Sequence, residues 1–174
     1  MMEHEDIVAA VIAAAGGQLT GRVRLQKTVY LLEQLGLSSS LSFEYHHYGP
    51  YSRDLDTATS DAKISELIVE ERAYRSDGAT YSIFKLKTAE SVSRSFGKIS
   101  SERAAELVKL FARTNVTVLE LAATVDWLWR REYCTDWRSE ITKRKGVKVQ
   151  NGRLEKAVEL LRQLDLSPPD SVAA

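Results

Sequence analysis

The spacing of apolar residues predicts two helices at the start of the chain. The first covers residues 3–15, and its apolar stripe consists of Val8, Val11, Ile12 and Ala15. The second covers residues 22–35, and its stripe consists of Leu25, Val29, Leu32 and Leu35. Thr20 is a suitable N-cap for the second helix, because its hydroxyl can accept a hydrogen bond from a backbone N–H of the first turn. Glycines follow both stripes, as expected where helices end.

The hydrophobic period changes to two after the second helix. Apolar and polar residues alternate over residues 41–48, and aromatic side chains dominate, which predicts a strand. Gly49 and Pro50 end this strand. Ser52 then stands where an N-cap is expected, before a helix predicted over residues 53–62.

A hairpin is predicted next. Two runs of β-forming residues, 67–74 and 80–86, are separated by a short polar segment. Asp77 and Gly78 in that segment favour the positive dihedral angles of a tight hairpin turn. A short helix is predicted after the hairpin, over residues 88–96.

The remainder of the chain has the pattern of helices. One begins at Ser100 or the next residue, and its inward positions are Ala104, Leu107, Val108 and Phe111. Thr117 and Glu120, three residues apart, fit a capping box. Residues 118–129 are apolar nearly all round, which is typical of a central buried helix. A final helix is predicted over residues 152–164.

This order of elements predicts an α+β fold that is mostly α. We expect a single domain over residues 3–166, with a winged-helix-like part at 3–96 and a C-terminal helical bundle at 100–166. In the small antiparallel sheet, the hairpin forms the wing and residues 43–48 supply one more strand. Residues 167–174 are expected to form a flexible tail.

Composition narrows the class of protein. The 174 residues include 24 Lys and Arg, 24 Asp and Glu, three histidines and one cysteine, Cys134. The balanced charge argues against a strongly basic nucleic-acid-binding protein, and a lone cysteine excludes an internal disulfide or an all-cysteine metal site. No apolar run is long enough for a membrane span, and residues 3–6 are acidic where a signal peptide is basic. We therefore expect a cytoplasmic protein without a membrane segment.

Charge is distributed unevenly along the chain. Residues 1–70 carry five basic and ten acidic side chains, whereas residues 71–174 carry nineteen basic and fourteen acidic ones. The densest basic stretch, residues 130–148, has seven basic and three acidic side chains. Such a stretch indicates either a partner surface or a solvated loop between helices.

Residues 45–51, Tyr-His-His-Tyr-Gly-Pro-Tyr, form the segment richest in candidate chemistry. Imidazole and phenol groups can act as acids, bases or metal ligands. Successive strand residues point to opposite faces, so His46 and His47 are not expected to share a metal. We assign no metal and no cofactor, and interpret the segment as an aromatic strand whose exposed edge contacts a partner.

Two single residues also attract attention. Cys134 follows several arginines that can lower a thiol pKa, but an isolated cysteine is interpreted as incidental. Asp126 lies within the apolar segment 118–129, and a buried carboxylate needs a partner. We expect that partner to be an arginine or the start of another helix.

Two alternative sets of contact residues follow. Aromatic and arginine side chains dominate interface energetics, and the candidate protein-partner surface consists of Tyr45, His47, Tyr48, Pro50, Tyr51, Arg53, Trp137 and Arg138. A winged helix can also bind DNA, although the helix predicted at 53–62 is acidic at its start and repels phosphates. The candidate nucleic-acid contacts are Arg72, Arg75, Lys85, Lys87, Lys143, Arg144 and Lys145.

Residues 24–32, 43–52, 119–124 and 154–161 each resemble a segment of one protein family, and the resemblance covers about residues 5–166. The chain thereby resembles the YwgA-like prokaryotic proteins, which are related to the Panacea (SocA-type) antitoxin domain. The resemblance implies protein binding, such as the neutralisation of a toxin. It implies no catalytic residue.

We therefore expect a non-enzymatic cytoplasmic protein-binding module, antitoxin-like or regulatory, whose partner is a protein such as a toxin. The alternative is a DNA-binding winged-helix transcriptional regulator. The apolar last helix is compatible with a homodimer. The partner and the roles of Asp126 and of the His46–His47 pair stay open at this point.

Overall fold

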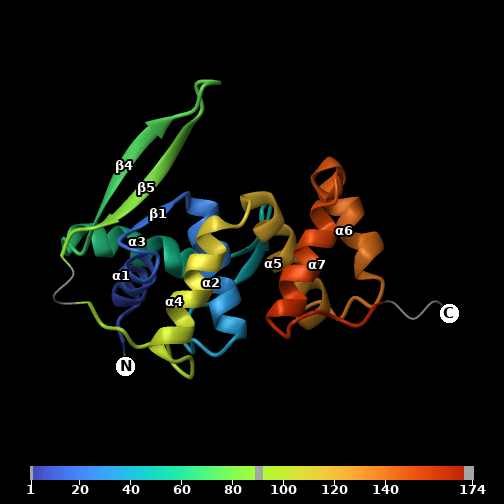
Figure 1. Cartoon of the computed structure of the whole chain (residues 1–174), viewed down its shortest axis with the longest axis horizontal. Helices are drawn as coiled ribbons and strands as arrows, with labels where there is room; N and C mark the ends of the chain where they lie inside the picture. The colour runs from blue at the N-terminus through green and yellow to red at the C-terminus, as the bar shows by residue number, and fades with distance from the viewer. Residues whose placement is uncertain (1, 89–91, 171–174) are drawn as a thin grey trace.

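The computed structural model describes residues 2–88 and 92–170, and these form an α+β protein that is mostly α, as predicted (Figure 1). The helices are α1 (His4–Ala14), α2 (Arg22–Gln34), α3 (Arg53–Ile64), α4 (Ser101–Arg113), α5 (Val116–Arg130), α6 (Trp137–Lys145) and α7 (Arg153–Gln163), with a 3-10 turn at Gly146–Val149. The strands are β1 (Gln18–Thr20), β2 (Glu44–His46), β3 (Gly49–Tyr51), β4 (Ile68–Tyr74) and β5 (Thr80–Leu86). No helix among the described residues has both the length and the apolarity needed to cross a bilayer.

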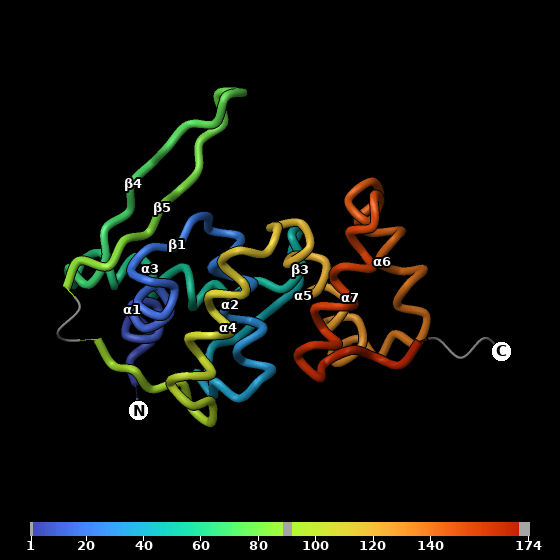
Figure 2. The backbone as a smooth tube through the Cα atoms, viewed as in Figure 1, coloured from blue at the N-terminus to red at the C-terminus, as the bar shows by residue number. Residues whose placement is uncertain are grey.

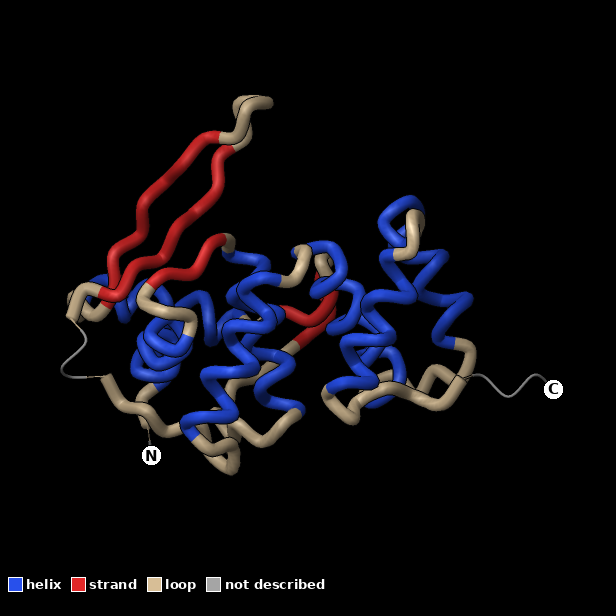
Figure 3. The backbone as a smooth tube through the Cα atoms, in the orientation of Figure 1, coloured by secondary structure: helices blue, strands red, loops and turns tan. Residues whose placement is uncertain are grey.

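The three-stranded sheet has the antiparallel order β1-β5-β4 (Figure 3). The hairpin of β4 and β5 is confirmed and projects from the helices as a wing. Its third strand is β1, in which Leu19 pairs with Phe84, and not residues 43–48 as predicted. The three residues between Gly17 and Gly21 are too few to display an alternating pattern, so a strand could not be predicted there.

The aromatic segment forms a separate two-stranded hairpin. Tyr45 pairs with Pro50 and His46 pairs with Gly49, so the predicted strand at 41–48 is shorter than expected and folds back as β3. Gly49 has a positive φ of 88° and packs on α5, where an added Cβ would overlap the Thr124 hydroxyl. Only glycine therefore suits this turn.

Helix α5 occupies the centre of the molecule, as predicted. Its residues 118–128 are all buried, and it contacts α2 on one side and α7 on the other (Figure 2). The basic stretch 130–148, for which a solvated loop was one of two interpretations, contains α6, which has Asp136 as its N-cap and also packs on α5.

Several local predictions differ from the structure. Thr20 belongs to β1, and Gly21 takes the N-cap position of α2. Asn115, not Thr117, caps α5, because its side chain accepts hydrogen bonds from the backbone N–H of the second and third helical residues. The caps predicted at Ser52 and Ser100 are confirmed.

Two predicted segments lie partly outside the described residues. Of the helix predicted at 88–96, residues 89–91 are not described and 92–95 are not helical. Of the predicted tail, residues 167–170 pack against α6, where Arg138 forms an ion pair of 3.0 Å with Asp170.

The wing is attached to the helices through Glu70 on β4. Its carboxylate accepts hydrogen bonds from Arg22 of α2 and Lys63 of α3, both at 2.7 Å, and from Ser82 of β5. Partial burial raises the pKa of this carboxyl group, but the hydrogen bonds from Lys63, Ser82 and Arg22 outweigh burial and lower the pKa to about 2.

We expect Glu70→Gln to lower the free energy of unfolding at pH 7 by about 2 kcal/mol, because charged hydrogen bonds are lost. A depressed carboxyl pKa stabilises the fold above the unfolded value, so the difference from wild type should shrink as pH falls from 4.5 toward 2. Urea denaturation measures both effects. Glu71→Gln, which removes an exposed pair with Lys85, is the control and should cost less than about 1 kcal/mol. Equal losses in the two variants would contradict the anchoring role.

Candidate functional site

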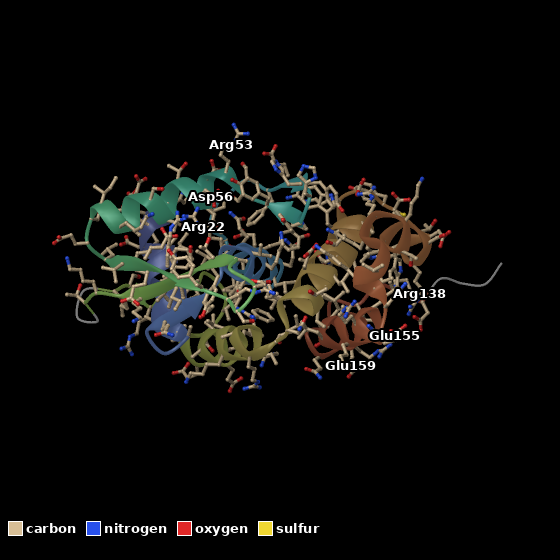
Figure 4. All side chains as sticks on the ribbon, turned by 90° about the horizontal axis from the view of Figure 1, so that it is seen from above. Arg22, Arg53, Asp56, Arg138, Glu155 and Glu159 are labelled. Carbon is tan, nitrogen blue, oxygen red and sulfur yellow. The ribbon has the colours of Figure 1, made fainter. Side chains whose placement is uncertain are left out.

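A pocket of about 280 Å³ opens between the start of α2, the start of α3 and the β2–β3 hairpin. We call it the hairpin pocket; four of its nine lining residues carry aromatic rings, and Val23 is the one aliphatic residue among the others. Arg22 of α2 and Asp56 of α3 both line this pocket, and Figure 4 shows them next to each other. The lining residues are Arg22, Val23, Gln26, Lys27, His46, His47, Tyr48, Tyr51 and Asp56.

The carboxylate of Asp56 is fixed on the pocket wall. One oxygen accepts a hydrogen bond from the Tyr51 hydroxyl, and the other accepts one of 3.0 Å from the Gln26 amide. Gln26 is itself held by the backbone of Ser52. The Gln26 side-chain NH2 donates to the Ser52 carbonyl at 2.9 Å, and the Gln26 side-chain oxygen accepts from the Ser52 N–H at 2.8 Å. The hydrogen bond to Asp56, together with burial, raises the pKa of the Tyr51 phenol. Asp56 was not among the predicted site residues, because it is one of several acidic residues on α3.

Aromatic rings form the opposite wall. The His46 ring packs against the Tyr51 ring in a tilted arrangement, with 4.5 Å between centroids, and contacts Glu44 at 2.8 Å. His47 lies in the turn after β2, so the two histidines do not alternate across a strand as predicted, and both line the pocket. Tyr48 is also open to solvent, and the residue is 55% exposed.

Lys27 and Lys145 hold the hairpin from behind, and together with Lys148 and Glu120 we call them the lysine cluster. Lys27 donates to the Pro50 carbonyl, while Lys145 donates to the His47 carbonyl at 3.1 Å. Lys145 also contacts Glu120 at 2.8 Å, and Lys148 contacts both Glu120 oxygens at 3.0 and 3.1 Å.

Lys27 is the least solvated member of the lysine cluster, with 1% of its surface exposed. Burial lowers its pKa to about 7, and the positive charges of Lys145 and Lys148 act in the same direction, against the effect of Glu120. The amine is thus half neutral near physiological pH, which lowers the cost of keeping it buried.

The predicted protein-partner residues do not form one surface. The hairpin members Tyr45, His47, Tyr48 and Tyr51 lie together, but Pro50 is buried. Trp137 is fully buried, and the guanidinium of Arg138 lies over its ring at 4.5 Å. Figure 4 places Arg53 and Arg138 on distant parts of the molecule.

Most of the predicted nucleic-acid contacts are already paired with carboxylates. Lys85 contacts Glu71 at 2.8 Å, Lys87 contacts Glu66 at 2.9 Å, and Arg75 contacts Asp77 at 3.4 Å. On α6, Arg144 binds Glu132 and Glu140, and Lys145 belongs to the lysine cluster. Arg72 and Lys143 are exposed on the wing and on α6. The seven residues therefore do not make a continuous basic surface.

The surroundings of Asp126 and Cys134 fit structural roles for both residues. Asp126 accepts hydrogen bonds of 2.7 Å from the Tyr30 hydroxyl and from Arg130, so the predicted arginine partner is present. Burial raises the pKa of both Asp126 and Tyr30. Burial and nearby carboxylates raise the pKa of the Cys134 thiol and outweigh the lowering effect of Arg144.

No family model matches the chain. Its sequence is similar to that of the DNA ADP-ribosyl glycohydrolase of Thermus aquaticus, with 29% identity over 135 residues. The match covers 71% of this chain and 34% of the relative, so the chain spans about a third of the length of that protein. The resemblance to YwgA-like and Panacea proteins, the protein partner and the homodimer stay predictions.

The similarity to a glycohydrolase corrects the functional expectation. A non-enzymatic binding module was expected from the lack of a familiar catalytic motif, the uneven charge and the family resemblance, and a transcriptional regulator was expected from the basic residues of the wing and of residues 130–148. The relative is named as an enzyme, which contradicts both of these interpretations. The residues of the hairpin pocket come from α2, the β2–β3 hairpin and α3, so they form no contiguous sequence motif.

We expect the stability of the protein to rise with pH between about 7 and 10, because the folded state loses the Lys27 proton while the unfolded chain keeps it up to its pKa of 10.5. The slope from this group is at most about 1.4 kcal/mol per pH unit. When denaturation curves are recorded at several pH values, Lys27→Met should lack this slope of stability against pH. Lys109→Met, on the exposed face of α4, is the control and should keep it. An unchanged pH dependence in Lys27→Met would rule out this assignment.

Proposed function

We propose that the chain takes part in the hydrolysis of the bond between ADP-ribose and DNA, and that the hairpin pocket holds the reacting part of the substrate. The similarity to an enzyme named for this reaction supports the choice of chemistry. The observation that carries the proposal is the Asp56 carboxylate, fixed by donors from α2 and β3 on the wall of an aromatic pocket.

A fixed carboxylate suits glycosidic bond cleavage. Positive charge develops on the ribose ring as the bond between its C1 atom and DNA breaks, and a nearby carboxylate stabilises that charge. Water then adds to C1, and its proton replaces the ribosyl group on the released DNA. An ionised carboxylate can accept about four hydrogen bonds. Tyr51 donates one to one oxygen of Asp56 and Gln26 donates one to the other, so about two acceptor sites remain for substrate or water.

The surrounding residues keep this carboxylate in place. Gln26 connects α2 to the first turn of α3 through three hydrogen bonds, and Tyr51 packs against His46. Side chains locked by a second set of contacts can act without reorganising during the reaction. The pocket walls also exclude part of the solvent, which strengthens electrostatic interactions inside.

Asp56→Asn keeps the shape of the side chain and removes its charge. We expect this variant to release ADP-ribose from an ADP-ribosylated oligonucleotide at least about 100-fold more slowly than the wild-type chain. Chromatography of the released ADP-ribose measures the rate.

Asp61→Asn provides the matched control, because Asp61 is exposed farther along the same helix. It should release ADP-ribose at the wild-type rate. No release by the wild-type chain, or equal rates for the two variants, would sink the proposed function.

A further inference from the structure

We propose that the hairpin pocket binds one unpaired base of single-stranded DNA, which stacks on Tyr48 while the adjacent phosphate contacts Lys148. The inference rests on the proposed function for the choice of DNA as ligand, and it adds the form of DNA that the pocket accepts. Three properties of the site support it: a rigid exposed ring, an adjacent surplus of positive charge, and a pocket of limited size.

The Tyr48 ring is a rigid and exposed platform. The residue is 55% exposed, although the turn that carries it is fixed on both sides. Lys145 holds the carbonyl of His47, Lys27 holds the carbonyl of Pro50, and Gly49 packs against Thr124. A ring presented by a fixed turn loses little conformational entropy on binding, and aromatic rings stack on any base.

Positive charge lies next to this ring. The Lys148 ammonium is 4.9 Å from the centroid of the Tyr48 ring, and 37% of its side chain is exposed. Glu120 already pairs with the buried Lys145, so two ammonium groups share one carboxylate. The lysine cluster therefore carries net positive charge beside the pocket, which favours a phosphate there.

The shape of the site favours a single strand over a duplex. The pocket of about 280 Å³ is at the lower end for ligand sites and suits one small aromatic group between Tyr48, Tyr51 and His46. Bases in a duplex are stacked on each other, so Tyr48 can meet a base face only after that base leaves the helix. Among the described cations of the wing, Arg75, Lys85 and Lys87 are paired with carboxylates, so Arg72 alone makes no extended track for a duplex backbone.

The test uses fluorescence anisotropy with a labelled, unmodified single-stranded oligothymidylate and with a labelled duplex, at low salt. We expect the single strand to bind at least 10-fold more tightly than the duplex. Tyr48→Ala should weaken single-strand binding about 10-fold, since a stacking contact is lost, and Tyr48→Phe should restore it. Lys148→Gln should reduce the dependence of binding on salt concentration. Tyr74→Ala is the control, because Tyr74 is 75% exposed on the wing, and it should bind like wild type.

The outcomes separate this inference from the proposed function, because the probe contains no ADP-ribose. Release of ADP-ribose together with binding that ignores Tyr48→Ala would overturn the inference and keep the function. Binding that depends on Tyr48 without any release would keep the inference and overturn the function. Duplex binding as tight as single-strand binding, or no binding of either, would overturn the inference. So would a protein that copurifies with wild type and not with Tyr48→Ala, since the pocket would then hold a protein side chain.

Discussion

The buried ion pair of Glu120 with Lys145 is the interaction on which the arrangement of the site depends. Both side chains are almost fully buried, at 5% and 3% exposure, on α5 and at the end of α6. Such a pair gains little net stability over apolar residues, but removal of one partner costs about 3–5 kcal/mol, because the other charge stays buried. Lys145 also binds the His47 carbonyl, so the same contact fixes α6, the central helix and the aromatic turn relative to one another.

The helices were predictable because their signals are local. Apolar stripes on α1, α2, α4 and α7, the continuous apolar run of α5 and the Asp77-Gly78 turn each need fewer than twenty neighbouring residues. Strand β1 was missed because its stability comes from pairing with β5, more than sixty residues away in sequence. Helix α6 was missed because only Trp137, Ile141 and Lys145 are buried, and one of these is charged.

The candidate site was predictable only in part, for a related reason. The aromatic residues of the hairpin are contiguous, so composition alone marked them. Gln26, Lys27 and Asp56 have functions set by contacts across elements, and nothing in their local sequence distinguishes them from ordinary helix residues. Lys27 lies in residues 24–32, which contributed to the family resemblance. Only the structure shows that its ammonium group donates to the Pro50 carbonyl. Trp137 shows the converse case, since an aromatic residue beside an arginine was interpreted as surface and is core.

The wing and the hairpin pocket are physically connected through Arg22. This arginine binds Glu70 on β4 and also lines the pocket, while Gln26 and Asp56 extend the same wall toward the base of the wing. A narrow second cavity continues there, between α2, α3 and Phe84 of β5. A displacement of β4 would therefore move the guanidinium at one end of the pocket without disturbing the lysine cluster at the other. The position of the wing is thus coupled through Arg22 to the Asp56 end of the pocket, whereas the Tyr48 end depends on the carbonyl contacts of Lys27 and Lys145.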